Sequence, residues 1–61
     1  MNATTARKLA ASGRTVAVGE DSNYRVIGVE RLNGQLWIKV NPVTVTGLNG
    51  TWVRAEDVHE I

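Results

Sequence analysis

Few residues of this chain are of types that do covalent or metal chemistry, and they are not grouped as a site requires. His59 is the only histidine, and none of the 61 residues is a cysteine. Glu56, Asp57 and Glu60 lie close to His59 in the sequence, but a zinc site needs three or four converging ligands. We therefore interpret this stretch as a solvated acidic segment and expect neither a metal site nor a cofactor.

Catalysis by a nucleophile has equally little support. Ser12 and Ser22 lie in polar segments without a nearby base, and no Walker or dinucleotide-binding motif occurs. Gly47 and Gly50 have the spacing of a nucleic-acid clamp loop, but that loop needs flanking helices, so a hairpin turn is the better interpretation. We expect no catalytic residues and no enzyme activity.

The two tryptophans are better suited to binding. On alternating strands, an inward Ile38 turns Trp37 outward, and an inward Val53 turns Trp52 outward. Two outward tryptophans on neighbouring strands, with cations beside them, form the kind of aromatic patch that is enriched at interfaces. The predicted protein-binding surface consists of Trp37, Trp52, Arg54, Lys39 and Tyr24.

The N-terminal residues predict a short helix over 4–11. Ala3, Ala6, Leu9 and Ala10 have helical spacing, Thr4 or Thr5 can cap the start, and Gly13 can end the helix. So short a helix is marginal alone and must dock on another surface. The favoured interpretation is that it covers one tryptophan and leaves the other open.

The charges are unevenly distributed and suggest an alternative function. Residues 1–19 carry three bases and no acid, residues 55–61 carry three acids, and the net charge is only +1. A basic helix on a small barrel could contact phosphates. The alternative nucleic-acid site consists of Arg7, Lys8, Arg14, Arg25 and Arg31. An ordinary solvated helix face is the more economical interpretation.

After Gly13 the pattern predicts short strands separated by turns. The expected strands are Thr15–Val18, Tyr24–Arg31, Gln35–Val40, Val43–Thr46, Thr51–Arg54 and His59–Ile61, with one helical turn over 55–58. Asn33-Gly34 predicts a type I′ hairpin, Gly28 a bulge, and Asn41-Pro42 a break.

Several short strands in so short a chain must curl to bury one face. We predict a helical appendage over 1–13 and a barrel over 14–61. The expected inward residues are Val16 or Val18, Val26, Ile27, Val29, Leu36, Ile38, Val40, Val43, Val45, Val53 and Val58.

Three segments resemble SH3-type barrels. Gly50-Thr51-Trp52-Val53-Arg54-Ala55-Glu56-Asp57-Val58 resembles the end of such a barrel, and Tyr24–Val29 and Leu36–Val40 resemble two strands of bacterial SH3-like domains. The resemblance implies a mainly β fold: an SH3-like barrel of five to six strands, with a short N-terminal helix and a 3₁₀ turn before the last strand.

The proline-peptide groove of eukaryotic SH3 domains has no counterpart here. Thr15–Val18 lacks the aromatic residues of that groove, Leu36 takes the position of its tryptophan, and Arg54 and Asp57 take those of its proline and tyrosine. We therefore expect no binding of proline-rich peptides.

The sequence predicts a non-catalytic SH3-like module for protein–protein interaction or self-association, of bacterial, phage or plasmid type, which could be a homo-oligomer. The alternative is the nucleic-acid-binding barrel, and an enzyme built around an oligomeric pore ranks third. No apolar run approaches the roughly 20 residues that span a bilayer. No continuous apolar stretch resembles a secretory signal either. We therefore expect a cytoplasmic protein without membrane contact.

Overall fold

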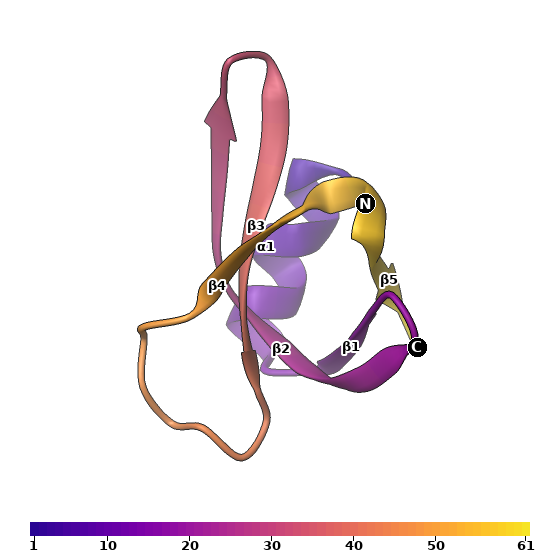
Figure 1. The fold of residues 1–61 in the computed structure, drawn as a ribbon, viewed down its shortest axis with the longest axis vertical. Coiled ribbons are helices and arrows are strands. Elements are labelled where there is room, and N and C mark those ends of the chain that lie inside the picture. Colours follow the sequence, from indigo (N-terminus) through magenta and orange to yellow (C-terminus); the bar gives the residue numbers. More distant parts are fainter.

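One helix and five antiparallel strands make up the computed structural model, which describes residues 1–61 (Figure 1). The elements are α1 (Ala3–Ser12), β1 (Thr15–Val18), β2 (Asp21–Leu32), β3 (Gln35–Pro42), β4 (Thr51–Arg54), the 3₁₀ turn η1 (Ala55–Asp57) and β5 (Val58–Glu60). The strands form one sheet in the order β4-β3-β2-β1-β5. The mainly β fold, the N-terminal helix and the 3₁₀ turn before the last strand confirm the prediction.

Helix α1 is one residue longer at each end than predicted. Its cap is Asn2, whose Oδ1 accepts a hydrogen bond from the Thr5 amide at 2.8 Å, so the prediction of Thr4 or Thr5 was wrong. Gly13 ends the helix as predicted, with φ 70° and its amide donating to the Leu9 carbonyl. The 10-residue helix is neither long nor apolar enough to cross a membrane.

The turn and the bulge in the β2–β3 hairpin confirm two further predictions. Asn33 and Gly34 both have positive φ, 52° and 77°, which a type I′ turn requires. They place Leu32 opposite Gln35. The register then shifts between Val26 and Gly28, where the bulge was expected.

The predicted strand Val43–Thr46 was wrong, and so was the break before it. β3 continues through Pro42, which a strand accommodates at its end, and the chain then forms a loop up to β4. Val43 and Val45 are each 43% exposed rather than in the core. The Val43 amide still donates to the Asn23 carbonyl of β2 at 2.9 Å, but the Val45 amide donates to the Pro42 carbonyl at 2.9 Å, and this turn ends the strand.

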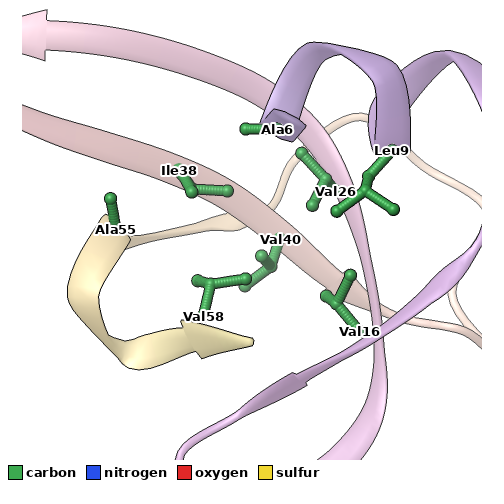
Figure 2. Close-up of a cluster of buried hydrophobic side chains, with 8 residues drawn as sticks. All are labelled: Ala6, Leu9, Val16, Val26, Ile38, Val40, Ala55 and Val58. Atoms are coloured by element: carbon green, nitrogen blue, oxygen red, sulfur yellow. The ribbon is translucent and has the colours of Figure 1, made fainter. Parts of the chain in front are cut away.

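Eight buried apolar side chains form one core inside the curled sheet (Figure 2). They are Ala6, Leu9, Val16, Val26, Ile38, Val40, Ala55 and Val58. Five of these were predicted; Ala55 and the two helix residues were not. Val18, Val29, Leu36 and Val53 are partly buried against the cluster, and Ile27 is half-buried at the bulge.

The helix docks on this core and not on a tryptophan, which corrects the favoured interpretation. Ala6 and Leu9 are 0% and 5% exposed and lie beside Val26 (Figure 2). Neither tryptophan belongs to the cluster or packs against it. The curled strands cover only part of the inward face of the sheet, and α1 covers the rest.

The two edges of the sheet are connected by η1. β5 pairs with β1, with Val18 opposite Val58, and η1 leads directly from β4 to β5. The Gly19 amide, in the β1–β2 turn, donates to the Asp57 carbonyl at 3.0 Å and ties this connection to the sheet. The curl leaves the outward face of β2, β3 and β4 on the opposite side from the core.

Candidate functional site

The outward side chains of β2, β3 and β4 form two rows across the sheet. In the first row Trp37 lies between Glu30 and Arg54, and in the second Lys39 lies between Gly28 and Trp52. Residues directly opposite on neighbouring strands share a face, so both rows lie on one surface. We call this surface the tryptophan face and define it as Glu30, Leu32, Trp37, Lys39, Trp52 and Arg54.

Each tryptophan on this face has a cation over its ring. Arg54 Cζ lies 5.8 Å from the centre of the Trp37 ring, and Lys39 Nζ lies 5.6 Å from that of Trp52. These distances are in the range of cation–π attraction, which contributes about 0.5–1 kcal/mol at exposed sites. The tryptophan lies on β3 in one pair and on β4 in the other, and each pair favours one position of its ring.

The ring of Trp52 extends from β4 across β3 as far as β2. Its Cη2 would lie 3.7 Å from a Cβ atom added at Gly28, and the Cβ of Lys39 would lie 3.3 Å from it. Gly28 has no positive φ, so its lack of a side chain matters here for space. A side chain at Gly28 would therefore crowd Lys39, whereas it would meet the Trp52 ring at an ordinary van der Waals distance.

A shallow hollow of about 300 Å³ opens on the tryptophan face. Its lining residues are Glu30, Leu32, Trp37 and Trp52. Leu32 is 59% and Trp52 41% exposed, and Trp37 is half-buried. The hollow is therefore apolar except for one carboxylate.

The sequence reasoning placed both tryptophans on the outward face correctly but missed Glu30 and Leu32. The sequence contains the information needed to place them on this face. A two-residue turn at Asn33-Gly34 puts Leu32 opposite Gln35 and Glu30 opposite Trp37. Tyr24 lies elsewhere. It is opposite Val16 and Pro42 near the other end of β2 and packs against the core.

The predicted basic residues do not form one surface. Arg7 and Lys8 are exposed on α1, and Lys8 and Arg14 line a hollow that they share with Glu60. The Nη2 of Arg25 donates to the Val45 carbonyl at 2.8 Å, which ties it to the loop after β3. Arg31 is exposed six residues further along β2, about 20 Å away at the rise of a strand.

The fold does not bring the metal-binding residue types together. His59 lies on β5 opposite Ala17, and no three side chains of His, Cys, Asp or Glu are grouped so that they could hold a metal ion. The one ion pair, Arg54 to Glu56 at 3.6 Å, is exposed and contributes little to stability.

No protein-family model, curated protein or solved structure matches this chain. The candidate site therefore rests on the geometry of the tryptophan face.

Proposed function

We propose that the chain is an SH3-like small barrel that acts as a non-catalytic protein–protein interaction or self-association module through the tryptophan face. The SH3-like assignment is supported by the 3₁₀ turn η1, which leads directly into a closing strand paired with β1. The observation that carries the function is the pair of outward tryptophans, each opposite a cation, on a surface that the helix leaves open.

The two indole rings supply a large area that a partner can bury. A tryptophan buries on the order of 150–250 Å² when it is covered, and tryptophan and arginine dominate the binding energy of many interfaces. Arg54 and Lys39 favour one position of the Trp37 and Trp52 rings before binding, which lowers the side-chain entropy lost on binding. The charged groups flank the rings as the polar rim of an interface does.

The nucleic-acid alternative has weaker geometric support. Arg25 is tied to a loop carbonyl, and Glu60 lies in the same hollow as Lys8 and Arg14. A phosphate contact surface needs several free cations side by side. We therefore favour a protein as the partner, and a second copy of the chain is one candidate for it.

Substitution of the tryptophans tests the proposal. We expect Trp37→Ala and Trp52→Ala to weaken self-association, or affinity for an identified partner, by about tenfold or more, as hot-spot residues do. Both variants should keep a cooperative unfolding transition, because neither ring packs against the core. Sedimentation velocity over a range of concentrations gives the mass, and urea unfolding gives the stability.

Leu48→Ala is the matched control, since Leu48 is 76% exposed but lies outside the tryptophan face. It should leave both association and stability unchanged. Global unfolding of both tryptophan variants would show that the rings are structural. Tryptophan fluorescence that is fully blue-shifted and resistant to acrylamide in a proven monomer would also contradict an open face.

A further inference from the structure

We infer that the hollow on the tryptophan face binds an arginine side chain of a partner protein. This inference deepens the proposed function and rests on it, because it specifies the chemistry of the group that enters the site. It depends on one carboxylate, two indole rings and the size of the hollow.

The carboxylate of Glu30 is the only charged group that lines the hollow. It forms no ion pair within the chain, because the single ion pair joins Arg54 to Glu56. The two cations of the tryptophan face, Arg54 and Lys39, lie over the tryptophan rings instead. Glu30 is therefore free to pair with a cation that a partner brings.

The remaining walls suit a flat cation with an apolar stem. Trp37, Trp52 and Leu32 provide the apolar lining, and about 300 Å³ is the lower end of the range for small-ligand sites, so one side chain fits better than a helix. A guanidinium is planar, stacks on indole and can pair with a carboxylate through two hydrogen bonds. A lysine ammonium is more strongly hydrated than a guanidinium and cannot form the two parallel hydrogen bonds to one carboxylate, so it suits the hollow less well.

The surrounding charge is compatible with a cationic guest. Lys39 and Arg54 add two positive charges to the face and Glu30 adds one negative charge, while Glu56 lies outside the face in η1 and pairs with Arg54. The face thus has a net charge of +1, and its only negative charge, on Glu30, lines the hollow. An acidic side chain, in contrast, would have to enter beside the unpaired Glu30 carboxylate.

The test uses short blocked peptides of glycine with one central arginine, lysine, leucine or glutamate. Binding is followed by the NMR shifts of the two indole N–H groups in the full chain. We expect the arginine peptide to shift both signals with a Kd in the millimolar range, the lysine peptide to bind several-fold more weakly, and the leucine and glutamate peptides not to saturate.

Glu30→Gln keeps the size of the side chain and removes its charge. It should weaken arginine binding about fivefold, the range of a partly exposed ion pair. Glu20→Gln is the control, because Glu20 is an exposed carboxylate in the β1–β2 turn, outside the tryptophan face. Trp52→Leu, which retains apolar area without a π face, should also weaken arginine binding, and its unfolding midpoint shows whether the fold is intact.

Failure of this inference and failure of the proposed function give different results. Equal binding of the arginine and leucine peptides, or an unchanged affinity in Glu30→Gln, would overturn the arginine assignment. The proposed function would still hold if the tryptophan variants lowered partner affinity or self-association. A third outcome is that the chain forms a dimer, that Glu30→Gln dissociates this dimer, and that the arginine peptide does not bind. The partner of the tryptophan face would then be a second copy of the chain, and the arginine assignment would be overturned.

Discussion

At Gly50 the backbone passes so close to β3 that no side chain fits. A Cβ atom added there would collide with the Val40 carbonyl oxygen and would lie 2.8 Å from Ile27 Cδ1. The constraint differs from that at Gly13, where a positive φ requires glycine although the space around it is open. At Gly50 the requirement is the close contact between two segments of the chain.

Gly50→Ala is therefore expected to destabilise the fold by about 1–3 kcal/mol, the usual cost of forcing extra atoms into a packed site. Urea unfolding measures this value. Gly47→Ala is the control within the same loop, because its Cβ would meet only the Asn49 amide nitrogen, at 3.9 Å, and its φ is not positive. It should change stability by less than about 1 kcal/mol. Equal effects of the two substitutions would show that the Gly50 contact relaxes without cost.

Strand alternation was sufficient to predict how the tryptophans point. Ile38 is fully buried, so Trp37, its neighbour, faces outward, and the same rule holds for Trp52 beside the half-buried Val53. What the sequence could not provide was the reach of the Trp52 ring across β3. That contact depends on the bulge in β2, which sets where Gly28 lies.

Among the elements, α1 has a different role from the one that its sequence suggested. Its amphipathic pattern requires a docking surface, but the pattern does not say which surface is available. Ala6 and Leu9 fill the inward face of the sheet because the strands alone bury too little apolar area to close it. The curvature of the assembled sheet decides this, and no local sequence signal records it.

Leu9→Ala tests this role of the helix. Removing a buried leucine costs about 2–5 kcal/mol, which is comparable to the whole stability of a chain of this size. We expect the variant to be largely unfolded at 25 °C, as measured by circular dichroism and urea titration. Lys8→Ala, the exposed neighbour on the same helix, should change stability by no more than about 0.5 kcal/mol. A stable, cooperative Leu9→Ala variant would contradict a structural role of the helix in the core.

Turns were predicted better than the strand after Pro42. Asn33-Gly34 and Gly13 act through local backbone preferences, which a sequence displays directly. Val43 and Val45 alternate like strand residues, yet only the Val43 amide reaches β2, at the Asn23 carbonyl, and the Val45 amide donates to the Pro42 carbonyl in a turn. The loop is instead held by the Asn41 Nδ2, which is buried and donates to the Gly47 carbonyl at 2.8 Å. A side-chain contact of this kind, between residues six apart, has no signature in the sequence.

Over the whole molecule, the fold disperses charges that the sequence had segregated. The chain has seven bases and six acids; three bases and no acid lie before Gly19, and three acids and no base lie after Ala55. Pairing of β5 with β1 brings the acidic segment back toward the basic one, and Glu60 comes to line the same hollow as Lys8 and Arg14. Glu60 thereby reduces the positive potential around Lys8 and Arg14, where binding of nucleic acid would need it.

This arrangement predicts weak binding to nucleic acid. About three phosphate contacts would give micromolar affinity at about 50 mM salt and a log–log salt slope near −2 to −3. We expect no saturable binding of a labelled 20-mer DNA or RNA under these conditions, as measured by fluorescence anisotropy, because Arg25 is tied to Val45 and Glu60 opposes the other cations. Glu60→Gln removes that opposing charge and should raise the residual affinity slightly. Micromolar binding with the steep slope, abolished by combining Lys8→Glu with Arg14→Glu, would establish the nucleic-acid function and displace the tryptophan face as the principal site.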